Sequence, residues 1–426
     1  MMAPPALRHP LFVRVWAGGV VSAVGTQMSN VAKAWVLYAI TGSAVALGIE
    51  GLCFSLPIML LPLLTGPLTD RLPRTAVLQA TMAAEAVLAT ALAATAATGT
   101  VRPWMLYLTA ALEASRLALD IPARNALIAT LVPAADLHSA QSLSSVVYSS
   151  SALIGPALGG VLLAVAGPAP VFALNAVSSV LALIAFRPVS ARLRQPATAA
   201  ADGRSGPPRL FDGARFAGRN PAILRLLVVL FSTSTLVIGT ETLLPVLDQT
   251  RWHGGPIGYG LLRMAPGIAA LVTGVFLSLR PQPASPGRAI LLSGIVAGGA
   301  LVAFPLAPRL WIAFALLAIG SVAVSAAQVF ILTGLQQRTP DRVRGAVGGF
   351  TAMTQSGFAG VAAAGMALGA GGIPAPAVII AVAAATAATA VLGNPPGRVA
   401  THDAEPAGQA DAVHPVPGPA KETRAG

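Results

Sequence analysis

Eight charged side chains interrupt the apolar runs of this chain. They are Lys33, Glu50, Glu85, Glu113, Arg116, Asp120, Glu241 and Arg263. A charge inside a long apolar stretch is costly, so such a residue is a candidate for function. A carboxylate beside a basic group can exchange that partner for a proton, which suits a proton relay or contact with a polar substrate.

Three of these charges follow one another on one predicted helix. Glu113 and Arg116 are three residues apart, and Arg116 and Asp120 are four apart, so all three share a helix face. We expect them to form a ladder of neighbouring charges. A static ion pair that holds two helices together is the alternative role for each of them.

Depth along the predicted helices suggests two further pairs. Counting about 1.5 Å per residue places Lys33 level with Glu50, and Glu241 level with Arg263. We therefore expect Lys33–Glu50 and Glu241–Arg263 contacts that stabilise one conformational state. For Glu85 we expect a structural role.

The composition indicates what positions these residues. The chain has 426 residues, of which 55% are hydrophobic and 10% are charged, and its mean hydropathy is +0.74. Typical soluble domains carry about 25% charged residues. A membrane-spanning helix needs roughly 20 mostly apolar residues, so the apolar residues suffice for about ten to twelve spans. These values exclude a soluble enzyme.

Apolar runs separated by Gly, Pro and Arg predict an all-α membrane protein with twelve transmembrane helices. The predicted spans are 13–39, 43–64, 75–98, 103–123, 140–166, 168–186, 222–247, 256–279, 287–306, 310–334, 345–370 and 372–393. We predict an N-terminal six-helix bundle over 1–186, a cytoplasmic linker over 187–221, a C-terminal six-helix bundle over 222–393, and a disordered cytoplasmic tail over 394–426.

The basic residues indicate the orientation. With a cytoplasmic N-terminus, 21 of the 27 Lys and Arg residues fall in cytoplasmic segments and three fall in outside loops. This split follows the positive-inside rule and predicts a multi-pass protein of the cell membrane with both termini in the cytoplasm. It also explains the net charge of +12 without nucleic acid.

No pattern in the sequence indicates catalysis or a metal site. Neither Lys33 nor Lys421 follows a glycine, so the phosphate-binding loop of ATPases is missing. The five histidines are scattered, so we expect no metal. We also expect no cofactor and no enzymatic activity.

The segment between the second and third spans is Gly66-Pro-Leu-Thr-Asp70-Arg71-Leu-Pro-Arg74. Glycine permits a tight turn, and Asp70 can accept hydrogen bonds at the N-terminus of a neighbouring helix. Arg71 and Arg74 can pair with carboxylates across a cytoplasmic interface. An ordinary basic loop on the cytoplasmic side is the alternative.

The fifth span contains Ser151-Ala-Leu-Ile-Gly155-Pro156-Ala-Leu-Gly159-Gly160. Its glycines allow close helix packing, and Pro156 kinks the helix. An ordinary glycine-rich helix contact is the alternative.

Both segments carry a family resemblance. The first resembles the signature loop of the major facilitator superfamily between helices two and three, with Pro73 in place of the usual glycine. The second is similar to the helix-five motif of proton-coupled antiporters, with Ser151 in place of the usual first glycine. With Phe12-Val-Arg14-Val-Trp16 and Pro122-Ala-Arg124-Asn125, residues 10 to about 394 resemble the branch of macrolide-efflux and enterobactin-exporter proteins.

The resemblance implies the major facilitator fold and a secondary active transporter. Such a protein would export a small organic molecule, a drug or secondary metabolite, by proton antiport with alternating access, and could confer drug resistance. Because these residues are charges inside predicted spans, we expect roles in proton coupling or the substrate cavity for Glu113, Arg116, Asp120, Glu241, Lys33, Glu50 and Arg263. The resemblance implies a gating loop at Gly66, Asp70, Arg71 and Arg74, and an antiporter-like motif at Gly155, Pro156, Gly159 and Gly160.

Two alternatives to export stay open at this point. One is a proton-coupled or facilitated importer, and the other is a transport-inactive receptor on the same scaffold. The partners we expect are a small organic substrate, protons and membrane lipid, but no nucleic acid. We expect a monomer.

Overall fold

In the computed structural model, every regular element is a helix within the residues that it describes, which are 4–69, 73–192, 210–280, 283 and 285–393. The first half contains η1 (Pro5–Arg8), α1 (Pro10–Thr41), α2 (Ala44–Thr69), α3 (Arg74–Ala97), α4 (Pro103–Leu131), η2 (Ala134–Asp136), α5 (Leu137–Ala166) and α6 (Pro168–Arg192).

The second half is more interrupted. It contains α7 (Leu210–Arg219), α8 (Pro221–Leu247), η3 (Asp248–Trp252), α9 (Gly255–Arg263), α10 (Ala265–Ser278), α11 (Pro286–Ala303), η4 (Phe304–Leu306), α12 (Leu310–Arg338), α13 (Asp341–Ala352), η5 (Met353–Phe358), α14 (Ala359–Gly369) and α15 (Ala375–Gly393). Each predicted span corresponds to one long helix or to consecutive helices, such as α9 and α10. The elements η3 and η5 are π-helical.

Local sequence explains where several helices begin and end. Proline occupies the first turn of α1, α4, α8 and α11, where its missing N–H costs no hydrogen bond. The side chain of Asn220 caps α8 by accepting from the backbone N–H groups of Ala222 and Ile223 at 3.1 and 3.3 Å, which satisfies donors that a helix start leaves free. Gly42 ends α1 with a φ of 60°, a conformation that glycine adopts without strain.

Apolarity divides the long helices into two groups. Eight stretches of the described chain are long and apolar enough to cross a membrane. Neither α1 nor α4 is among them, although they have 32 and 29 residues. These two helices carry the buried charges Lys33 and Glu113, and such residues in a membrane protein face the interior of the bundle.

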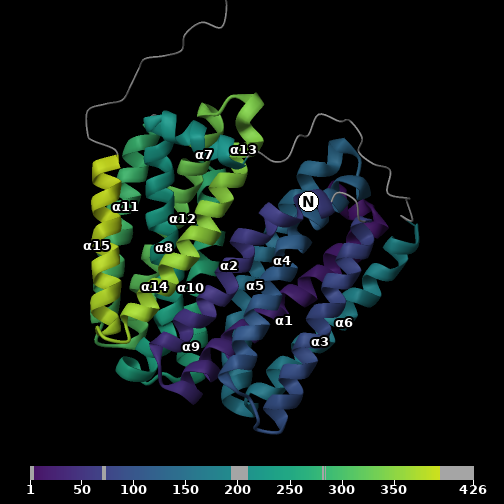
Figure 1. Cartoon of the computed structure of the whole chain (residues 1–426), viewed down its shortest axis with the longest axis horizontal. Helices are drawn as coiled ribbons and strands as arrows, with labels where there is room; N and C mark the ends of the chain where they lie inside the picture. The colour runs from purple at the N-terminus through teal and green to yellow at the C-terminus, as the bar shows by residue number, and fades with distance from the viewer. Residues whose placement is uncertain (1–3, 70–72, 193–209, 281–282, 284, 394–426) are drawn as a thin grey trace, which may run out of the picture.

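The two halves form separate bundles that meet at one end. In Figure 1 they diverge toward the end that carries the N-terminus, α7 and α13, and converge toward the end that carries α9. His9 pairs with Asp136 at 2.8 Å, which ties the start of α1 to the segment before α5. The far ends of α1 and α5, near Thr41 and Ala166, therefore lie where the bundles converge.

Glycines form the contact between α5 and α9. A Cβ at Gly160 would lie 2.6 Å from the Pro256 carbonyl oxygen, and a Cβ at Gly260 would lie 2.6 Å from the Pro156 carbonyl oxygen. Both distances are shorter than van der Waals contact, so only glycine lets the two backbones approach this closely.

A second contact of small residues joins α2 to α14. A Cβ at Gly48 would lie 2.9 Å from the Ala364 carbonyl oxygen, and one at Gly357 would lie 2.9 Å from Cβ of Met59. The contacts Gly160–Pro256 and Gly48–Ala364 define two seams between the bundles near the convergent end. One seam joins α5 to α9, and the other joins α2 to α14. Together the seams hold the bundles in this arrangement.

The predicted linker 187–221 is not wholly irregular, because α6 continues to Arg192 and the helix α7 lies within it, packed on α13 through Gly213. This stretch is polar in sequence because α7 is amphipathic and covers another helix with one face only. The tail 394–426 lies outside the described residues.

The seam predicts the effect of a larger side chain. Gly160→Leu places atoms where the backbone of Pro256 lies, so we expect the convergent ends of α5 and α9 to separate. Spin labels at the exposed positions Val165 and Ile257, in a Cys53→Ser background, should report a longer mean distance by pulsed electron paramagnetic resonance.

Gly274→Leu on α10 is the matched control, because a Cβ there meets no atom within 4 Å. Its distance distribution should equal that of the parent. An unchanged distribution for Gly160→Leu would contradict the role assigned to the seam.

Candidate functional site

A buried ion pair links α1 to α4. Lys33 Nζ pairs with Glu113 Oε2, and the side chains are only 4% and 8% exposed. The expected Lys33–Glu50 pair is therefore wrong. Glu50 is less buried than Glu113, and an unpaired charge costs more the more deeply it is buried, so the lysine compensates Glu113.

Glu50 on α2 is left without a direct partner. In the part of the chain that the structure describes, its half-buried carboxylate forms neither a hydrogen bond nor an ion pair. It still interacts electrostatically with Lys33, Glu113 and Arg263. Since Arg263 belongs to the other bundle, Glu50 couples charges across the interface.

The second bundle contains the expected pair of Glu241 and Arg263. Arg263 Nη1 on α9 donates to Glu241 Oε2 on α8. One turn away on α9, Tyr259 is 2% exposed and stacks on Trp35 of α1, with ring centroids 5.8 Å apart. The aromatic contact brings the two ion pairs into one layer between the bundles. We call Lys33, Glu50, Glu113, Glu241 and Arg263 the charged layer.

Glu85 lies at the centre of a four-helix clamp. Its Oε2 is 2.8 Å from Arg116 Nε on α4, although that N–H is not aligned as a hydrogen bond. Its Oε1 accepts from Asn175 Nδ2 on α6 at 3.1 Å and from Thr26 Oγ1 on α1 at 3.4 Å. Partners from three other helices surround this 3% exposed residue, which is the arrangement of a structural ion pair.

The expected ladder on α4 is wrong as a set of mutual contacts. Glu113 pairs with Lys33 and Arg116 pairs with Glu85. Asp120 pairs with Arg124 at 3.0 Å and accepts from Thr81 Oγ1 on α3 at 3.0 Å. The three charges share a face of α4, but each needs an opposite charge close by. Packing brings Lys33 of α1 to Glu113 and Glu85 of α3 to Arg116, whereas Asp120 pairs with Arg124 on α4 itself.

Asp248 is a buried charge that the sequence analysis missed. It follows directly after the predicted span 222–247 and is 0% exposed. Its carboxylate faces the backbone N–H groups of Gly254 and Gly255 at the start of α9, without well-aligned hydrogen bonds. The positive end of the helix dipole compensates an anion there. The pair Gly254-Gly255 shortly after an acidic residue was the signal that could have revealed it.

The antiporter-like motif lies at a three-helix junction. On α5, Gly155 and Gly159 pack against Gln27 and Met28 of α1, whereas Gly160 contacts α9 of the other bundle. Pro156 contributes its carbonyl oxygen to the same seam. The motif thus joins the helix that carries Lys33 to the helix that carries Arg263.

Part of the predicted gating loop lies outside the described residues, namely Asp70 and Arg71. Gly66 lies in α2, and Arg74 is the first residue of α3. Within the described ranges, no group of three or more His, Cys, Asp or Glu residues is arranged to hold a metal ion.

Comparison with known proteins agrees with this architecture. Residues 2–411 match a family of the major facilitator superfamily that is described as transmembrane secretion effector. Over 173 residues the chain is 30% identical to YfiS of Bacillus subtilis, an uncharacterized MFS-type transporter, and this stretch covers 40% of each protein.

Two solved structures share the fold. One is a bacterial homologue of the iron transporter ferroportin in an inward-facing state, with a TM-score of 0.69, 17% identity, and coverage of 91% of this chain and 97% of that one. The other is the nucleoside transporter NupG, with a TM-score of 0.67, 13% identity, and coverage of 90% and 98%.

The helical architecture of the described residues is the twelve-helix major facilitator fold, and its apolar helices make the chain a multi-pass membrane protein. A transporter of this kind moves its substrate without chemical conversion, so the chain is not an enzyme. With the match over residues 2–411, these findings show that the chain belongs to the transmembrane secretion effector family of major facilitator transporters.

Proposed function

We propose that this transporter exports a small organic molecule across the cytoplasmic membrane by proton antiport with alternating access. The resemblance of its helix-five motif to that of proton-coupled antiporters supports the proton as the coupling ion. The resemblance to macrolide-efflux and enterobactin-exporter proteins, together with the family description as secretion effector, supports the outward direction.

The orientation follows from the distribution of basic residues. With both termini in the cytoplasm, the α5–α9 and α2–α14 seams lie on the extracellular side. The bundles then diverge toward the cytoplasm, so this arrangement is the inward-facing state, in which cargo binds from inside the cell. The ferroportin homologue of similar fold was solved in an inward-facing state.

The observation that carries the proposal is the unpaired carboxylate of Glu50 within the charged layer. It interacts electrostatically with both members of the Lys33–Glu113 pair in its own bundle and with Arg263 of the Glu241–Arg263 pair in the other. A carboxylate without a fixed partner can accept a proton without breaking an existing ion pair. Its protonation therefore changes the attraction between the bundles.

Protonation of Glu50 gives a coupling mechanism. When Glu50 is ionised, its attraction to Arg263 of the second bundle adds to the contacts that hold the extracellular seams together. When Glu50 takes up a proton, this attraction is lost. The equilibrium between the inward-facing and outward-facing states then shifts toward the outward-facing state. Cargo that stabilises this arrangement and a proton that weakens it thus oppose each other's binding, as antiport requires.

The clamp around Glu85 has a different role in this scheme. Its partners Arg116, Asn175 and Thr26 all belong to the first bundle, so a movement of one bundle against the other leaves them together. The clamp keeps the first bundle rigid while the charged layer responds to protons.

Neutralising Glu50 should uncouple transport. We expect Glu50→Gln to abolish proton release on cargo addition and accumulation driven by a pH gradient, while cargo exchange without a gradient persists. A cargo is chosen by comparing growth inhibition of cells with and without the protein, and transport is measured in proteoliposomes that contain a pH-sensitive dye.

Asp136→Asn is the control, because Asp136 is an acidic residue paired with His9 away from the charged layer. It should keep the coupling of the parent. Gradient-driven accumulation by Glu50→Gln at the parent's level would refute the assignment.

The Lys33–Glu113 pair should behave as a buried ion pair in a double-mutant cycle. Lys33→Met leaves Glu113 buried and uncompensated, which costs about 3–5 kcal/mol for pairs of this kind. Adding Glu113→Gln removes the uncompensated charge and should recover much of the loss. Unfolding transitions of the four purified proteins give the interaction energy. Additive losses would contradict the pairing.

A further inference from the structure

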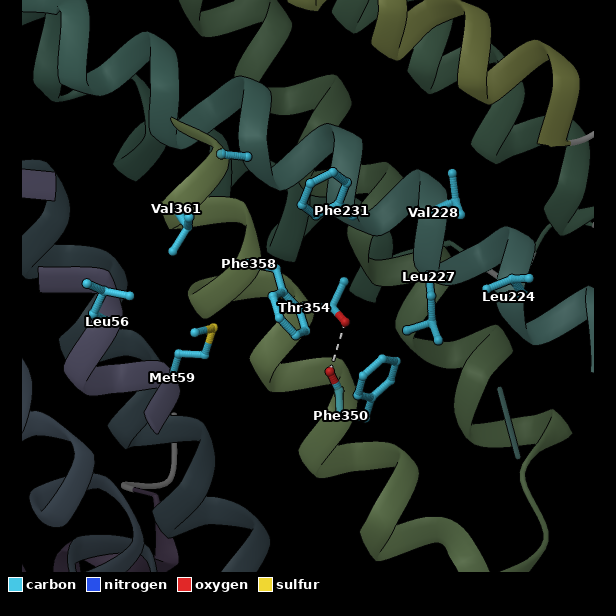
Figure 2. Close-up of a pocket in the computed structure, with 11 residues that line it drawn as sticks. Leu56, Met59, Leu224, Leu227, Val228, Phe231, Phe350, Thr354, Phe358 and Val361 are labelled. Atoms are coloured by element: carbon cyan, nitrogen blue, oxygen red, sulfur yellow. Dashed lines mark hydrogen bonds between the residues drawn. The ribbon is translucent and has the colours of Figure 1, made fainter. Parts of the chain in front are cut away.

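An apolar pocket lies between the two bundles, apart from the charged layer. Its volume is about 570 Å³, which falls within the range of about 300–1,000 Å³ for sites that bind small molecules. Leu56 and Met59 of α2 form one wall, and α8, the end of α13, η5 and the start of α14 form the other (Figure 2). On α8, the lining residue Phe231 precedes Glu241 by ten residues, or about 15 Å, toward the divergent end.

The lining specifies an uncharged ligand. It consists of Leu, Met, Val, Phe and Ala side chains and one threonine. The hydroxyl of Thr354 donates to the Phe350 carbonyl oxygen at 2.9 Å (Figure 2), so its proton is not free for a ligand. A charged group would lose its hydration here without a replacement partner, and therefore the pocket excludes it.

The aromatic side chains narrow the class of ligand. Phe350 and Phe358 stand edge to face with centroids 6.3 Å apart, and Phe231 lines the same space from α8 (Figure 2). Aromatic rings interact favourably with other rings in offset or edge-to-face geometry. An aromatic or alicyclic ring system fits this lining better than a polar chain.

The π-helix η5 gives the wall its shape. Thr354 and Phe358 on η5 line the pocket, while Gln355 on the same turn donates to Gln328 of α12 at 3.4 Å. Gln328 in turn donates to Ser234 of α8 at 3.3 Å, one turn beyond Phe231. Irregular π-turns inside α-helices occur frequently at functional sites, and this one separates an apolar surface from a polar, uncharged one.

We propose that this pocket binds the apolar body of the transported compound, an uncharged aromatic or alicyclic ring system. This rests on the proposed function, because it takes the space between the bundles as the transport path. One wall comes from each bundle, so both walls contact a ligand only while α2 and η5 keep this arrangement. The ligand thereby stabilises the state that binds it.

Binding of a neutral aromatic probe tests the pocket directly. N-phenyl-1-naphthylamine, an uncharged fluorophore, is titrated onto the purified transporter in lipid nanodiscs, with empty nanodiscs subtracted. We expect saturable binding to the parent and its loss in Val228→Trp, whose indole fills the pocket. Phe231→Ala removes one ring and should raise the dissociation constant by about threefold to tenfold.

Val329→Trp on α12 is the matched control, because Val329 is 43% exposed and Val228 is 44% exposed, and Val329 does not line the pocket. It should bind the probe as the parent does. Binding by Val228→Trp equal to that of the parent, or the same loss in Val329→Trp, would overturn the proposal. If Val228→Trp does not fold, unchanged affinity in Phe231→Ala overturns it.

The assay separates this proposal from the proposed function, since probe binding needs no pH gradient. Loss of binding in Val228→Trp together with a parent that lacks proton-coupled transport would leave the pocket in place and refute the antiport. Intact antiport in the parent with no saturable binding would refute the pocket alone.

Discussion

The structure depends on one constraint: a charge buried in apolar surroundings must be compensated by a partner close by. This chain places several charges inside helices that are otherwise apolar, and the packing of α1, α3, α4 and α6 follows from their pairing. Glu85 takes partners from three other helices, and Lys33 takes Glu113. Breaking such a pair by removing one partner costs more than the pair itself contributes, so these contacts select one arrangement of the helices.

The same constraint divides the charges by function. Charges whose partners lie within one bundle, such as Glu85 with Arg116, stay paired when the bundles move. Glu50 is different, because it has no direct partner among the described residues and interacts with charges of both bundles. A group of this kind is sensitive to protons and to the position of the bundles at once, which is the property that coupling in an alternating-access transporter needs.

Glycine and aromatic residues provide what the charges do not. The seams at Gly160 and Gly48 let the backbones of the two bundles approach closely on one side, where van der Waals packing rather than charge holds them. Toward the other side the bundles diverge, and the space between them is apolar near Phe231 and Phe358. In the proposed mechanism, the separation of the charged layer from the apolar pocket lets proton binding and ligand binding act on one motion through different contacts.

The sequence by itself determined the helices, the membrane class and the family resemblance, because these depend on local patterns: apolar runs of spanning length, proline at helix starts and basic residues between spans. It also revealed the Glu241–Arg263 pair, since both residues fall at one depth of adjacent spans. Only the tertiary structure decided that Lys33 pairs with Glu113 rather than Glu50, and that Asp248 is buried. Depth along a helix does not specify which face meets which neighbour, and that choice follows from packing all the helices together.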